Sequence, residues 1–131
     1  MEDKKVKIAV KRPNEDKIEF VEISSVGGWS EMAKIVGGGE RVTLDRVHFT
    51  ANPYELTMYV DDNGLLKELP LNFYLETDNH YYPVQAIVGT ACFARGKIVD
   101  DDVVYEDLTE IDKAFIVLII EKGKCINGVA H

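Results

Sequence analysis

Aromatic rings and side-chain amides gather in one stretch, NFYLETDNHYYPVQ, at residues 72–85. The residues that combine ring faces with hydrogen-bond donors and acceptors are Asn72, Phe73, Tyr74, His80, Tyr81, Tyr82 and Gln85. Surfaces of this kind stack bases or sugars and bond to their edges. The alternative is that Phe73 and one tyrosine belong to the core, and that Asn72, in a Pro-x-Asn element, caps a turn.

Thr90 and Arg95 follow this stretch and complete the predicted ligand site. Thr90 comes directly after Gly89 in an apolar segment, where a glycine lets a ligand or another backbone approach closely. An arginine in this neighbourhood can neutralise a phosphate despite the acidic total charge. The predicted ligand-binding residues are therefore Asn72, His80, Tyr81, Tyr82, Gln85, Thr90 and Arg95.

No sequence pattern indicates catalysis or a metal site. His48, His80 and His131 lie far apart, and none has an acidic or cysteine neighbour at the spacing of a metal site or of a nucleophile's base. The serines lack a GxSxG pattern, and Cys92 and Cys125 form no CxxC pair. We therefore predict a protein that is not an enzyme, with no catalytic residue, no metal and no cofactor.

The charge balance favours neither nucleic acid nor a membrane as a direct partner. Fifteen basic residues stand against twenty-three acidic ones, a net charge of −8, which opposes approach to a polyanion unless the basic residues cluster on one face. The densest acidic run, VDDDVVYEDLTEID at 99–112, is typical of a solvated face. The alternative is a surface that mimics nucleic acid and binds a partner protein through Asp100, Asp101, Asp102, Glu106 and Asp107.

Length and composition indicate a single domain over residues 1–131. Hydrophobic residues make up 46% of the chain and charged residues 29%, a balance that buries a core without disulfides or a structural metal. The N-terminal MEDKKVKIAV lacks the plan of a signal peptide, and the longest apolar stretch, AFIVLII at 114–120, is far shorter than a membrane span of roughly 20 residues. We predict a cytoplasmic protein with free thiols.

Three consecutive glycines at 37–39 raise the question of a phosphate-binding loop. Such a loop runs from a strand into a helix, so that the free N–H groups of the helix N-terminus face the anion. Here an apolar stripe of helical period precedes the glycines and an alternating segment follows them. We therefore predict that Gly37 ends a helix with a positive φ, and that these glycines do not bind phosphate.

Hydrophobic periodicity predicts an α+β domain, with a mainly antiparallel sheet of about five strands and two short helices. Strands are predicted at 4–11, 17–23, 41–49, 55–60 and 84–94, the last of them central to the sheet.

Helices are predicted at 29–36 and 109–120. The second has Thr109 as N-cap and Asp112 at N3, and a short helical turn is expected after Pro70, at 71–75. The apolar AFIVLII offers more surface than one small sheet covers, so a homo-oligomer is expected.

This order of elements resembles the domain-of-unknown-function family numbered 3846 over residues 5–113. The pieces that carry the resemblance are the helix-ending Gly37 or Gly38, the element Leu69–Pro70–Leu71–Asn72, the pair Gly89–Thr90, and the segments DDNGLLKELPLN, IVGTACFARG and DLTEID. The resemblance implies a small protein of bacteriophages or mobile elements and no established catalytic residue. Residues 114–131 are then a C-terminal extension that covers the sheet or forms an oligomer interface.

Two functions follow from these expectations. In the first, a non-enzymatic phage or mobile-element accessory protein acts against host defence by binding and sequestering a small, anionic, nucleotide-derived immune signal. In the second, the acidic surface binds a host defence protein and inhibits a nuclease or restriction enzyme. The choice of signal sequestration extends an analogy with other small phage proteins.

Overall fold

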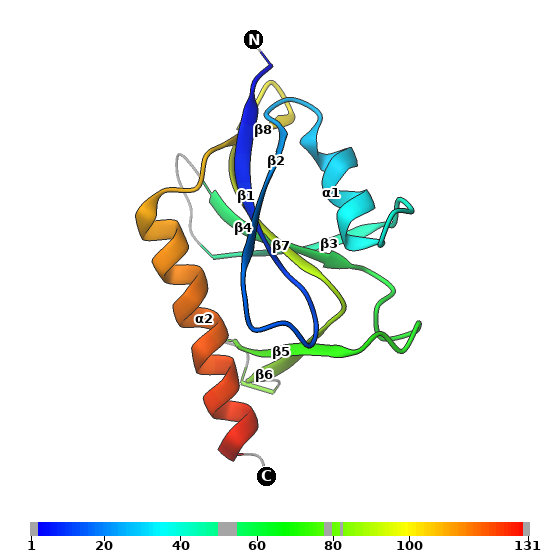
Figure 1. Ribbon diagram of the computed structural model, residues 1–131, viewed down its shortest axis with the longest axis vertical. Helices are drawn as coiled ribbons and strands as arrows, with labels where there is room; N and C mark the ends of the chain where they lie inside the picture. The colour runs from blue at the N-terminus through cyan, green and yellow to red at the C-terminus, as the bar shows by residue number, and fades with distance from the viewer. Residues whose placement is uncertain (1–2, 50–54, 78–79, 82, 130–131) are drawn as a thin grey trace.

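The structure is a computed structural model of the chain, and it describes residues 3–49, 55–77, 80–81 and 83–129, of which 124–129 are described by their backbone alone. Within these residues the elements follow one another as β1 (Lys5–Lys11), β2 (Glu19–Ser24), α1 (Gly28–Val36), β3 (Leu44–His48), β4 (Glu55–Asp61), β5 (Leu71–Glu76), β6 (Val84–Val88), β7 (Ala91–Val99), β8 (Asp102–Glu106) and α2 (Glu110–Val129). The predicted α+β class is confirmed, with more strands than expected and two sheets in place of one (Figure 1).

The larger sheet is antiparallel and is built around β7. Its strand order is β2-β1-β7-β4-β3, with β8 also paired to β7. Strand β1 pairs with the first half of β7, at Ala91–Phe93, and β8 pairs with the second half, at Arg95–Val99. Because β4 pairs with β7 across residues from both halves, β1 and β8 share the opposite edge of β7.

Both faces of this sheet are covered, by different elements. In Figure 1 α1 lies on one side of the sheet and α2 on the other, with β5 and β6 at the lower end. Successive residues of β7 face opposite ways: Cys92 belongs to the core under α1, and Phe93 to the core shared with β5, β6 and α2. The domain therefore has two hydrophobic cores separated by one sheet.

Helix α1 confirms the prediction at 29–36, but its end differs from the prediction. Met32, Ala33 and Val36 are buried on its inner face. Gly37 has φ −83, and the positive φ values of 70 and 115 belong to Gly38 and Gly39. Glycine is required at position 37 for another reason, because a Cβ there would overlap the backbone oxygen of Glu40.

The predicted strand 84–94 is broken at Gly89 into β6 and β7, which belong to different sheets. Gly89 has φ 74, and a Cβ at this position would lie 2.8 Å from Leu69 Cδ1. The chain therefore turns there under the side chain of Leu69. Only the second half of the predicted strand is central to the larger sheet.

The helical turn predicted at 71–75 is wrong. These residues form β5, which pairs antiparallel with β6. Phe73 and Leu75 are buried, Tyr74 between them is only partly buried and Glu76 is exposed, which is the period of a half-buried strand. Leu71 is exposed because the register shifts between Leu71 and Phe73. Pro70 precedes the strand, where its missing N–H costs no ladder hydrogen bond.

The acidic run forms a hairpin that the sequence reading missed. Asp100 and Asp101 have φ values of 50 and 68 and connect β7 to β8. Two positive φ values in a two-residue connection are typical of a type I′ turn, in which aspartate is favoured. Strand β8 then buries Tyr105 in the core under α1.

Helix α2 extends the helix predicted at 109–120. The cap predicted at its start is confirmed: Thr109 Oγ1 accepts a hydrogen bond from Asp112 N at 3.0 Å, and Asp112 Oδ2 accepts one from Thr109 N at 2.9 Å. These two bonds form a capping box. No helix in the described part of the chain is long and apolar enough to cross a membrane.

Cys92 is expected to be chemically inert in the folded protein. Burial raises the pKa of its thiol to about 12, and only the thiolate attacks an alkylating reagent. In a Cys125→Ser protein, iodoacetamide at pH 8 should leave Cys92 unmodified in native buffer and modify it fully in urea, as measured by mass spectrometry. Rapid modification of the native protein would show that the core under α1 opens easily.

Candidate functional site

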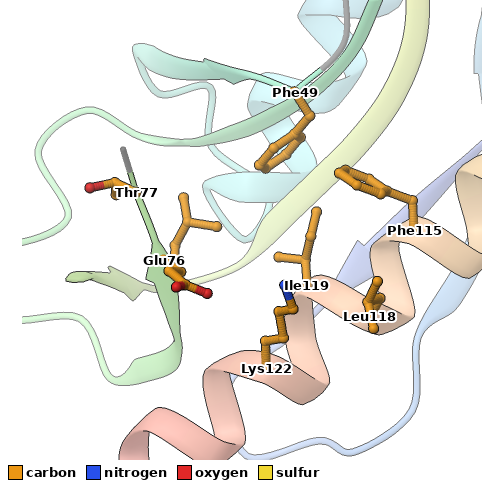
Figure 2. Close-up of a pocket in the computed structure, with 8 residues that line it drawn as sticks. Phe49, Glu76, Thr77, Phe115, Leu118, Ile119 and Lys122 are labelled. Carbon is orange, nitrogen blue, oxygen red and sulfur yellow. The ribbon is translucent and has the colours of Figure 1, made fainter. Parts of the chain in front are cut away.

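A cavity of about 350 Å³ opens between α2 and the end of β5. The residues that line it are Phe49, Leu75, Glu76, Thr77, Phe115, Leu118, Ile119 and Lys122, and we refer to it as the α2 cavity. Figure 2 shows Phe49 and Phe115 on one side, Glu76 and Thr77 across from them, and Lys122 below. Its volume lies within the range of small-molecule sites.

The apolar wall of the α2 cavity rests on a row of stacked rings. Phe49 stacks on Phe93 at 6.3 Å between centroids, and it meets Phe115 edge-on at 5.9 Å. Phe93 in turn stacks on Phe73 at 6.3 Å. Phe93 is fully buried, whereas Phe49 and Phe115 are only partly buried. The core thus fixes two rings whose surfaces face the cavity.

The rim of the α2 cavity carries one carboxylate, one hydroxyl and one ammonium group. Glu76 and Lys122 are exposed, and within the described residues neither forms an ion pair. Thr77 N donates to Pro83 O at 2.8 Å, so Pro83 lies beside Thr77 at the rim. Charged groups of both signs are therefore available to a ligand.

Part of the predicted ligand site lies near this rim. His80 and Tyr81 belong to the segment that closes on Thr77, and Tyr81 is 88% exposed. Tyr82 lies outside the described residues. Gln85 follows on β6 and is exposed. Of the described residues, neither His80, Tyr81 nor Gln85 lines the α2 cavity.

Asn72 and Thr90 occupy a different place, at the junction of the two sheets. Asn72 Nδ2 donates to Lys11 O at 2.7 Å and to Gly89 O at 2.8 Å, and Asn72 Oδ1 accepts from Lys11 Nζ at 3.0 Å. The amide thus ties β1 to the turn between β6 and β7. This role is close to the alternative that Asn72 caps a turn. Thr90 lines a shallow depression with Arg12 and Lys34.

Arg95 lies on the larger sheet and points towards α2. Its Nη1 lies 3.3 Å from Asp112 Oδ2 and 3.4 Å from Asp112 Oδ1. This ion pair joins the sheet to the first turn of α2. The structure therefore does not gather the six described residues of the predicted ligand site into one place.

The acidic residues predicted for a partner protein are also partly engaged within the fold. Glu106 Oε2 lies 3.2 Å from Lys4 Nζ, and Asp107 Oδ1 accepts a hydrogen bond from Lys7 N at 2.7 Å. Asp100, Asp101 and Asp102 lie at the tip of the β7–β8 hairpin and are exposed. Asp107 is exposed as well, so four of the five residues face solvent, three of them together at the hairpin tip.

A second polar cluster lies on the α1 side of the sheet and was missed by the sequence reading. His48 Nδ1 lies 3.0 Å from Thr57 Oγ1 and 3.1 Å from Glu55 Oε2, across paired strands. Arg46 lies over the ring of Trp29 at 5.5 Å. The adjoining cavity measures about 30 Å³, which admits little more than a water molecule. In the described part of the chain, no group of three metal-binding side chains occurs.

A family model described as "Domain of unknown function (DUF3846)" matches residues 6–119. The chain belongs to this family. No curated protein and no solved structure matches the chain. The DUF3846 match extends beyond residue 113, so residues 114–119, which the resemblance placed in a C-terminal extension, lie inside the matched region, Phe115 and Ile119 among them. Lys122 lies outside it.

Two sequence elements that suggested DUF3846 meet in the structure. Gly89 N donates to Pro70 O at 2.8 Å, and Gly89 O accepts from Asn72. The Leu-Pro-x-Asn element and the Gly-Thr pair thus form one junction between the two sheets. In this DUF3846 chain they position β5, and β5 positions one wall of the α2 cavity.

The residues that line the α2 cavity were not singled out from the sequence. Phe115, Leu118 and Ile119 belong to the apolar run AFIVLII, which predicted a helix face but not a cavity. Phe49 ends a predicted strand far from them in sequence.

Proposed function

We propose that the chain is a non-enzymatic binding protein that holds a small anionic nucleotide in the α2 cavity and withdraws it from solution. The observation that carries the proposal is the placement of two partly buried rings, Phe49 and Phe115, opposite a rim of mixed charge. The cavity volume of about 350 Å³ suits one small ligand and not a polymer.

Each part of a nucleotide has a matching group in the cavity. A base has two π faces and packs against phenylalanine rings. Ribose hydroxyls can donate to the Glu76 carboxylate, and a phosphate can accept from the Lys122 ammonium group. Among the described residues, the lining contains no histidine, cysteine or serine, which supports binding without chemical change.

The biological part of the proposal rests on the setting that the family resemblance implies. In a phage or mobile element, the nucleotide that we propose as the ligand is a signal made by host immunity, and its sequestration in the host cytoplasm acts against defence. The acidic-mimic alternative has less support, because Glu106 and Asp107 are engaged within the fold.

Lys122→Ala tests the phosphate contact. Calorimetry with nucleoside monophosphates, cyclic nucleotides and ADP-ribose should show saturable binding to the unaltered protein. A lost hydrogen bond to a charged group costs about 1.5–3 kcal/mol, so Lys122→Ala should weaken nucleotide binding roughly tenfold to hundredfold. The corresponding uncharged nucleosides should bind both proteins equally.

Lys113→Ala is the matched control on the same helix. Lys113 pairs with Glu110 at 3.2 Å and does not line the cavity, so nucleotide affinity should not change. Equal losses in both variants, or no rise in melting temperature with any nucleotide, would contradict the proposal. Recovery of a cleaved nucleotide would make the protein an enzyme, and salt-sensitive capture of a basic nucleic-acid-binding protein would favour the acidic mimic.

A further inference from the structure

We propose that the free edge of β6 pairs with β6 of a second copy of the chain. The two strands run antiparallel about a two-fold axis at Ala86, and they join two two-stranded sheets into one four-stranded sheet. This interface is separate from the α2 cavity and does not depend on the proposed ligand.

Strand β6 has one paired edge and one uncovered edge. It pairs with β5, and within the described residues it pairs with no other strand. The opposite edge of β5 is covered by α2, where Gly123 packs directly on the backbone of Tyr74. A two-stranded sheet is marginal by itself, and β6 offers the position at which it can grow (Figure 1).

The hydrogen bonds of the β5–β6 hairpin fix which backbone groups point outward. Pro83 O accepts from Thr77 N, and Gly89 N donates to Pro70 O, so positions 83 and 89 both face β5. Because bonding alternates along an antiparallel strand, Val84, Ala86 and Val88 direct their N–H and C=O groups away from β5.

The composition of β6 differs from that of the edge strands of the larger sheet. Strand β6 reads VQAIV and carries no charge, and Val84 is 40% exposed. Strand β2 carries Glu19 and Glu22, and β3 carries Asp45, Arg46 and His48. Charged side chains protect an edge from pairing. The edge of β6 lacks this protection.

The outward groups of β6 are self-complementary. With Ala86 opposite Ala86 of the second copy, Val84 lies opposite Val88 of that copy, and all three outward positions meet as hydrogen-bonded pairs. No two like charges face each other within this register, because β6 has none. A second copy of the chain is therefore the partner that this edge fits.

Two substitutions at position 86 test the interface. Ala86→Pro removes an N–H that points away from β5 and so leaves the hairpin bonds intact. Ala86→Lys, on an exposed side chain, places two ammonium groups opposite each other in the dimer. Light scattering should give the mass of two chains for the unaltered protein and of one chain for both variants, with unchanged circular dichroism. Amide exchange at Val84, Ala86 and Val88 should slow as protein concentration rises.

Leu66→Lys and Leu118→Glu are the comparison variants. Leu66 is an exposed loop residue, and Leu66→Lys should remain dimeric. A protein that is monomeric at every concentration up to the millimolar range would overturn the proposal. A dimer that survives both Ala86 variants but is lost in Leu118→Glu would also overturn it, because α2 would then be the interface.

Discussion

Gly123→Val is expected to lower the free energy of unfolding by about 3 kcal/mol, at the upper end of the cost of overpacking a core. Gly123 is buried, and a Cβ there would overlap the carbonyl oxygen of Tyr74. This oxygen belongs to the backbone of β5, which β6 holds in place, so it cannot move aside. Helix α2 must instead shift away from β5. Because both elements line the α2 cavity, nucleotide binding should weaken as well.

Urea denaturation followed by circular dichroism measures this loss. The matched control is Ala114→Val, which places the same β-branched side chain on the exposed face of the same helix. It should lower the free energy of unfolding by at most about 0.7 kcal/mol, the difference in helix propensity. If Gly123→Val unfolds at the same urea concentration as the unaltered protein, the close packing of α2 on β5 is wrong.

Asp112→Ala is expected to cost about 3 kcal/mol, because one carboxylate performs two tasks. It accepts the hydrogen bond from Thr109 N that closes the capping box, a contribution of about 1 kcal/mol. It also pairs with Arg95, whose side chain is 26% exposed. Removing one partner of a buried pair costs about 3–5 kcal/mol, and the partial exposure of Arg95 reduces this figure.

Three further variants separate the two tasks of Asp112. Thr109→Ala removes only one bond of the capping box and should cost about 1 kcal/mol. Asp112→Asn keeps an acceptor for Thr109 N but loses the charge, so its cost should lie between those of Thr109→Ala and Asp112→Ala. Arg95→Met combined with Asp112→Ala should cost less than the sum of the two single changes. Strict additivity would show that the ion pair contributes nothing.

Local patterns in the sequence predicted the elements whose cause is local. The stripe Met32–Val36 predicted α1, and Thr109 with Asp112 predicted the start of α2, because a helix and its cap are determined by near neighbours. The break at Gly89 could not be predicted in the same way. The apolar run continues across it, and only the packing of Leu69 shows that the chain turns.

The candidate site was less predictable than the fold. A ligand site was predicted in the stretch 72–85 because its aromatic and amide residues are neighbours in sequence. In the structure, Phe73 belongs to the core and Asn72 joins two sheets. The cavity instead combines Phe49, Phe115 and Lys122. Phe115 and Lys122 lie seven residues apart in α2, so helical spacing places them on one face, but only tertiary packing brings Phe49 to that face.

The shared edge of β7 has a consequence for the synthesis of the protein. Ala9 of β1 pairs with Phe93 of β7, and Tyr105 of β8 pairs with Gly96 of β7. Strand β1 leaves the ribosome first, but β7, with which it pairs, is synthesised only in the last third of the chain. Such distant pairing makes folding slow, since a long loop must close before the contacts stabilise it. Until β7 emerges, the β1–β2 hairpin exposes Val6, Ile8 and Val10. We therefore expect the nascent chain to gain its sheet only after translation is nearly complete, and to depend on chaperones until then.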